Sequence, residues 1–171
     1  METYVKEVLY AYPILQTVEE DYKAHIQNKA ILSYKSDKPA EVLMEYIAGE
    51  IEEKRKLEWL KDCIQRALEK LSNVEQLLVA VKYFGKNHPK KQPLAQWHEN
   101  EKYFVWSERK YFRMQNRIIG KISGLLRIEG LTEELFKKEY ETMDIFHKIH
   151  NYIQSGKDKG ISSREKRWLR I

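Results

Sequence analysis

The chain has 171 residues, of which 33% are charged and 42% hydrophobic, and one cysteine, Cys63. This length indicates one domain, or one compact domain with an appendage, and the apolar content is too high for a disordered tail. Seven glycines and four prolines are too few for the many turns of an all-β sandwich or for a glycine-rich nucleotide-binding fold. We therefore expect an all-α protein, a helical bundle with a long central helix and a helix-turn-helix-like segment.

The N-terminal stretch has a helical apolar period. Tyr4, Val8, Leu9 and Tyr12 share one face. Pro13 is expected to break or restart this helix, because proline lacks an N–H donor. The apolar period then continues to about Asn28.

A long helix is predicted from Pro39 to about Leu71, because no proline interrupts it and its apolar positions repeat every three or four residues. Such a helix cannot be solvated on all sides. It is expected to pack against the N-terminal helices as an antiparallel hairpin, or against a second copy of itself. Residues 1–71 are accordingly predicted to form an N-terminal helical hairpin.

Ser72-Asn73-Val74-Glu75 has the pattern of a capping box and predicts a helix from Val74 to Phe84 that ends at Gly85. A connector rich in proline and lysine follows over residues 86–93. Ser107 is placed to cap a helix that runs to about Arg127 and is closed by Gly130.

Thr132 is expected to open a covering C-terminal helix to about Tyr152. Residues 72–153 are therefore predicted to be a helix-turn-helix-like DNA-binding region. Residues 154–171, which contain Trp168 among several basic residues, are predicted to be a basic, mobile tail.

The net charge of +5 is unevenly distributed. Residues 1–71 have 11 basic and 14 acidic side chains, residues 72–130 have 11 and 5, and residues 131–171 have 9 and 7. On a helical wheel of residues 107–127, the apolar side chains occupy one half. The other half holds the polar and basic residues Arg109, Lys110, Arg113, Asn116, Arg117, Lys121 and Arg127, and no acidic residue lies on it.

A row of like charges disfavours an isolated helix by a few tenths of a kcal/mol per pair, and a purely solvated face usually mixes in acids. A helix that binds phosphates gains affinity from the same charges through counterion release. Arginine and asparagine also pair with guanine and adenine in the major groove. The alternative interpretation is a basic solvent-exposed face that binds no ligand.

Residues 74–127 resemble the helix-turn-helix of bacterial sigma factor region four, and more closely the small phage transcriptional regulators of the ArpU-type group. Val81-Lys82-Tyr83-Phe84-Gly85 is similar to the end of the helix that packs behind that motif. Leu94-Ala95 corresponds to the start of its first helix, and Trp106 to Arg113 to the turn and the opening of the recognition helix. The resemblance implies DNA contacts by Ser107, Arg109, Lys110, Arg113 and Arg117.

Other chemistry finds little support in the sequence. Cys63 is expected to be a buried, inert thiol, and His147 and His150 lack a third metal ligand at a matching spacing. We expect no catalytic residues, no metal and no cofactor. The N-terminus lacks the regions of a signal peptide, and the longest apolar run, Leu77–Val81, cannot cross a bilayer, so a cytoplasmic protein is expected.

The favoured hypothesis is a sequence-specific DNA-binding transcriptional regulator of bacterial or phage type, not an enzyme, with a recognition helix over residues 107–127. Asn116 and Lys121 join the implied contacts as candidate DNA-binding residues because they lie on the same face. RNA polymerase or a homodimer partner would bind through helix 39–71. The alternatives are a non-enzymatic adaptor that binds a protein partner through helix 39–71, and a phage DNA-packaging component.

Overall fold

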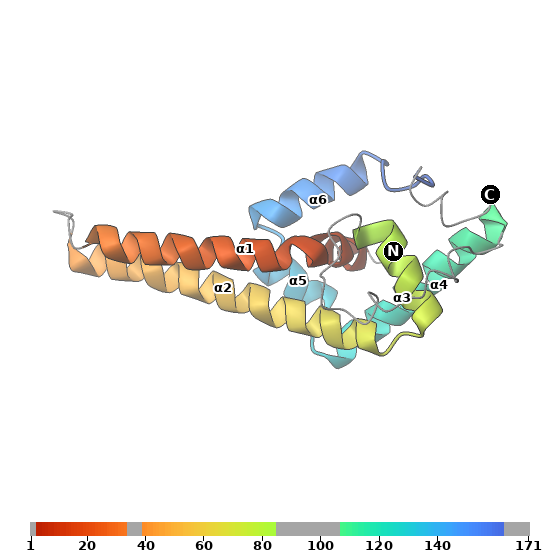
Figure 1. Ribbon diagram of the computed structural model, residues 1–171, viewed down its shortest axis with the longest axis horizontal. Helices are drawn as coiled ribbons and strands as arrows, with labels where there is room; N and C mark the ends of the chain where they lie inside the picture. The colour runs from red at the N-terminus through yellow and green to blue at the C-terminus, as the bar shows by residue number, and fades with distance from the viewer. Residues whose placement is uncertain (1–2, 34–38, 85–106, 163–171) are drawn as a thin grey trace. The chain divides into compact units, whose positions relative to one another are not determined.

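The computed structural model describes residues 3–33, 39–84 and 107–162, and every regular element within these ranges is helical. This confirms the all-α prediction. The chain forms two compact units, which we call the core unit (residues 1–13 and 63–171) and the hairpin unit (residues 14–62). Figure 1 shows the helices in chain order.

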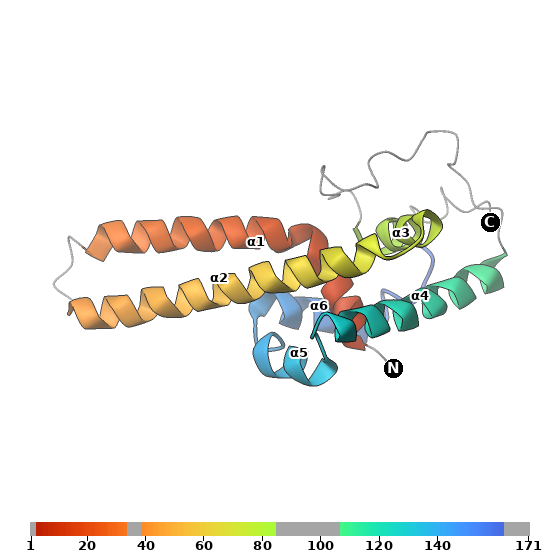
Figure 2. The same ribbon diagram turned by 90° about the horizontal axis from the view of Figure 1, so that it is seen from below.

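The hairpin unit pairs the second part of helix α1 (Thr3–Ser33) with the first part of helix α2 (Ala40–Glu69). The two helices run antiparallel, side by side in both views (Figures 1 and 2). Hydrogen bonds between them include Lys61 to Glu19 (2.6 Å), Tyr22 to Glu53 (2.5 Å) and His25 to Tyr46 (3.2 Å). The predicted long helix and its antiparallel pairing with the N-terminal helix are therefore confirmed.

The predicted helix break at Pro13 is wrong, because α1 continues through this residue. A proline inside a helix costs about 3 kcal/mol, since it removes one backbone hydrogen bond and crowds the preceding turn. Burial of Tyr12 and Leu15 on either side of Pro13 offsets this cost. Pro13 instead marks the boundary between the two units.

The first turns of α1 belong to the core unit, so the compact units divide the chain differently from the predicted boundary at residue 71. Tyr4 lies 6.0 Å from Phe136 between ring centroids, and Tyr12 lies 5.3 Å from Phe84. These aromatic contacts join the N-terminus to segments far away in the sequence. Hydrophobic periodicity alone does not reveal such pairings.

The end of α2 and the next helix are tied together by side-chain hydrogen bonds. The Ser72–Glu75 capping box forms as predicted and starts α3 (Asn73–Val79). A π-helical turn, η1 (Ala80–Phe84), follows directly. The buried Gln76 amide donates to the carbonyls of Leu68 (2.9 Å) and Leu71 (3.2 Å) at the end of α2, and the Leu68 carbonyl also accepts from the Leu71 N–H at 3.0 Å.

Helix α4 (Glu108–Ile128) begins and ends where the sequence predicts. The Ser107 hydroxyl accepts a hydrogen bond from the Lys110 N–H, which confirms the cap. Gly130 has φ 94°, a conformation that favours glycine, and the Leu131 N–H donates to the Leu126 carbonyl at 2.9 Å.

The single covering helix predicted after Thr132 is wrong, because two helices form, α5 (Glu133–Glu139) and α6 (Asp144–Gln154). On one straight helix Phe136 and Phe146 would lie about 15 Å apart along the axis. The break brings their ring centroids to 5.0 Å in an edge-to-face contact. Burial of both rings in one cluster therefore favours the break between α5 and α6 over one continuous helix.

The described start of the predicted tail is attached to the core unit. Asp158 is buried, forms an ion pair with Lys6 at 3.0 Å, and its carbonyl accepts a hydrogen bond from Lys82 at 3.0 Å. Gly85, the connector and Trp168 lie outside the described residues.

Glu7, in the core unit, is a buried carboxylate that bonds His150 at 2.6 Å. Burial raises its pKa, Glu141 adds to this rise, and His150 and Lys137 oppose it. A carboxyl whose folded pKa exceeds its unfolded value loses its stabilising contribution as pH rises through the folded pKa. We therefore expect Glu7→Gln to gain stability relative to the wild type as pH rises from 4.5. Urea unfolding at a series of pH values measures this difference, and a relative loss for Glu7→Gln would contradict it.

Candidate nucleic-acid interface

Helix α4 is anchored to the core unit by its apolar face. Five of its large apolar side chains are buried: Tyr111, Ile118, Ile119, Ile122 and Leu126. The 3.6-residue period places these positions on one side of the helix, so burial of that side determines which residues face solvent. The basic residues are thus held on a helix that cannot rotate about its axis without losing its core contacts.

The opposite face presents a row of basic residues spaced four positions apart, Arg109, Arg113, Arg117 and Lys121, which we call the basic row. Arg109, Arg113 and Arg117 are all exposed, as is Asn116 between them. Within residues 3–33, 39–84 and 107–162, no acidic side chain forms an ion pair with any of these three arginines. Neither α5 nor α6 covers them, because all three remain exposed.

Lys121, at the end of the row, differs from the arginines. Its ammonium binds Glu75 Oε2 at 2.7 Å. Partial burial would raise the pKa of Glu75, but hydrogen bonds from Lys121 and the Ser72 backbone outweigh it, and the pKa is lowered. This carboxylate also completes the capping box of α3. Lys121 therefore fastens α4 to α3 and is less available to a ligand than the arginines.

Ser107 and Lys110 lie at the start of the interface and are both exposed. The Ser107 oxygen caps the helix and its hydroxyl hydrogen is not needed for that bond, so it can still donate to a phosphate. Of the seven predicted DNA-binding residues, the structure thus places all on α4 or its cap, with Lys121 held by Glu75.

Two polar residues on the buried face of α4 were not anticipated from the sequence. Gln115 donates to the Leu78 carbonyl at 3.4 Å, and Ser123 lies 3.4 Å from the Tyr4 hydroxyl. Gln115 occupies a core position of the helical wheel, which was the available signal, whereas Ser123 lies at the edge of the apolar half next to Asn116 and the wheel does not reveal its burial. Their hydrogen bonds help to fix α4 against α3 and α1 and so orient the basic face.

The arginine row has dimensions suited to DNA. The major groove of B-DNA, about 12 Å wide, admits an α-helix of about 10–12 Å diameter, and the row from Arg109 to Arg117 extends about 12 Å along the helix. An arginine side chain can bind a phosphate or pair with guanine through two hydrogen bonds. The arrangement can therefore bind a polyanion along its backbone and can present Arg113, Asn116 and Arg117 to base edges.

Comparison of the chain with protein-family models, with curated proteins and with solved structures returns no match. The resemblance to sigma region four thus rests on the residues quoted for it. Its turn and first helix, between Leu94 and Trp106, lie outside the described residues. In the described ranges, no helix is both long and apolar enough to span a bilayer.

Proposed function

We propose that this protein binds double-stranded DNA through the exposed basic face of α4. The observation that carries the proposal is the row Arg109, Arg113 and Arg117, exposed and without an acidic partner in the described chain. Unpaired like charges on one face are costly to a helix unless a polyanion compensates them. Sequence-specific transcriptional regulation, as in the phage and sigma-type regulators that residues 74–127 resemble, is the role proposed for this surface.

In this mechanism the two faces of α4 have separate tasks. The buried face fixes the orientation of the helix in the core unit, which lowers the entropy lost when its side chains bind DNA. Lys110 and the arginines neutralise phosphates, which provides affinity independent of sequence. Base contacts by Arg113, Asn116 or Arg117 would provide the discrimination between sequences.

The adaptor alternative requires a contiguous apolar surface on the long helix. The large exposed apolar residues of α2 include Val42, Met44 and Tyr46. Val42 and Tyr46 lie one turn apart on one face, but Met44 is about 200° around the helix axis from each of them, so the three residues do not form one contiguous patch. This distribution favours the basic surface over a large adaptor interface as the site of function.

Titration of fluorescently labelled duplex DNA at several salt concentrations tests the proposal. If each of the three arginines neutralises one phosphate, log K should fall with log salt with a slope of about −2.7 or steeper. Affinity that does not change with salt, or no binding at low salt, would overturn the proposal.

A single substitution then tests the site. Arg113→Ala should weaken binding and make the salt slope shallower by about 0.9, because one phosphate contact is lost. Lys148→Ala is the matched control, since Lys148 is an exposed cation on α6 in the same unit. Equal losses in both variants would show that the DNA contacts are not concentrated on α4.

A further inference from the structure

We propose that Glu75 is an internal competitor of DNA: it holds Lys121 of the basic row in an ion pair and thereby lowers the affinity of the α4 face for phosphates. Glu75 lies on α3, outside the interface that the sequence predicts. The inference rests on the proposed function, since it concerns how strongly the same face binds DNA. It adds a residue that regulates this affinity without itself binding the ligand.

Lys121 has the position of a further phosphate contact. It follows Arg117 by four residues, which is about one turn and about 6 Å along the helix. Its side chain is 43% exposed, so a ligand can reach the ammonium. The same ammonium lies 2.7 Å from Glu75 Oε2. Lys121 is therefore a cation at the edge of the basic face that already has an anionic oxygen as its partner.

The Glu75 carboxylate is held in place by α3. Its Oε2 also accepts a hydrogen bond from the Ser72 N–H at 2.9 Å, and the Glu75 N–H donates to the Ser72 hydroxyl at 3.4 Å. The neighbouring Gln76 is bonded to the end of α2. The carboxylate thus cannot move away from α4 without losing the capping box. Its oxygen offers Lys121 the same kind of acceptor that a phosphate offers, an anionic oxygen within hydrogen-bond distance.

A phosphate that approaches Lys121 meets one of two costs. If Lys121 stays with Glu75, the phosphate lacks that charge-assisted hydrogen bond. If Lys121 transfers to the phosphate, the Glu75 carboxylate loses its partner and repels the phosphate. Arg109, Arg113 and Arg117 carry no such cost, because no acidic side chain in the described part of the chain pairs with them. Glu75 therefore weakens binding at the Lys121 end of the basic row and leaves the arginine contacts intact.

The contact that Glu75 restrains carries no sequence information. A lysine binds phosphate as a point charge, whereas discrimination between sequences comes from contacts to base edges. We therefore expect Glu75 to lower the affinity for every duplex by a similar factor, without changing the preference among sequences.

The substitution Glu75→Gln tests the proposal because it removes the charge and keeps the cap: glutamine at this position of a capping box also accepts the N-cap N–H. The variant should bind labelled duplex DNA about 5- to 10-fold more tightly at about 0.1 M salt, with a salt slope steeper by about 0.9, since one phosphate contact is gained. The matched control is Glu134→Gln, which changes the net charge equally at an exposed position of α5. It should change the affinity by less than about twofold, because salt screens distant charges.

The substitution Lys121→Ala shows whether the gain depends on Lys121. In this background Glu75→Gln should tighten binding by less than about twofold, because no ammonium is released. An equal gain in both backgrounds, or a Glu75→Gln variant that binds no more tightly than the wild type, would overturn the proposal and leave DNA binding by the arginines standing. A wild type that does not bind duplex DNA at low salt would overturn the proposed function and this inference together. Thermal unfolding of each variant checks that the fold is retained.

Discussion

Replacing Phe136 by alanine should lower the free energy of unfolding by about 3–5 kcal/mol. Phe136 is 1% exposed, and its ring contacts Tyr4, Tyr140 and Phe146 at centroid distances of 6.0, 5.9 and 5.0 Å. The substitution removes the buried ring and leaves a cavity between the N-terminus of α1 and the two C-terminal helices. Urea unfolding followed by circular dichroism measures the loss.

The matched control is Ile128→Ala at the end of α4. Ile128 is 74% exposed, so this change should alter stability by no more than about 0.5 kcal/mol. A similarly small effect at Phe136 would contradict the conclusion that the aromatic cluster joins the first turns of α1 to α5 and α6.

Reversing the charge of the whole arginine row should reduce DNA affinity by about two to three orders of magnitude at about 0.1 M salt. The variant combines Arg109→Glu, Arg113→Glu and Arg117→Glu. Each replacement removes a phosphate contact and adds a charge that DNA repels. The fold should persist, because these side chains are exposed and a glutamate row has the same i, i+4 repulsion as the arginine row. Anisotropy titration and thermal unfolding monitor affinity and fold.

A second triple variant distinguishes a specific surface from total charge. Lys148→Glu, Lys157→Glu and Lys159→Glu change the net charge by the same amount, at exposed positions of the core unit that do not belong to α4. This variant should retain most of the affinity. Equal losses in the two triple variants would mean that binding depends on total charge and not on the α4 face.

Most helices of this protein follow from local chemistry. The Ser72–Glu75 box and Ser107 start helices through side-chain oxygens that accept neighbouring N–H groups, and Gly130 ends one because it adopts positive φ readily. The exposed and buried faces of α4 follow from its 3.6-residue period. These features depend on residues within one or two turns of each other, so the sequence reveals them directly.

The two predictions of helix ends that the structure shows to be wrong have a different origin. Pro13 stays inside α1, and the helix expected after Thr132 breaks between Glu139 and Asp144. In both places burial of aromatic or aliphatic side chains against distant segments outweighs the local preference. No local signal shows that Phe136 and Phe146 share one cluster with Tyr4.

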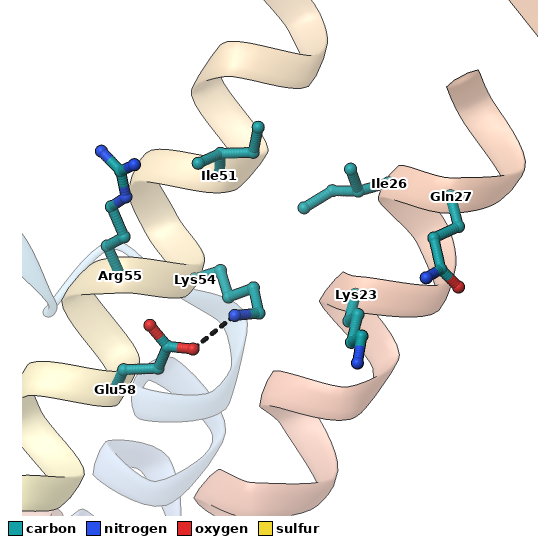
Figure 3. A pocket seen from close by; sticks show the side chains of 7 residues that line it. All are labelled: Lys23, Ile26, Gln27, Ile51, Lys54, Arg55 and Glu58. Carbon is teal, nitrogen blue, oxygen red and sulfur yellow. Dashed lines mark hydrogen bonds and ion pairs between the residues drawn. The ribbon is translucent and has the colours of Figure 1, made fainter.

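The sequence by itself determined the helical class of this protein, the positions of its caps and the separation of basic from apolar side chains on α4, because each rests on short-range periodicity and capping. Only the tertiary structure decided that Lys121 is held by Glu75 and that three arginines stay exposed beside it. Only the tertiary structure also showed that Ile26 of α1 and Ile51 of α2 line one groove (Figure 3). Ion pairs and grooves form between segments far apart in the chain, and their geometry exists only after those segments have packed.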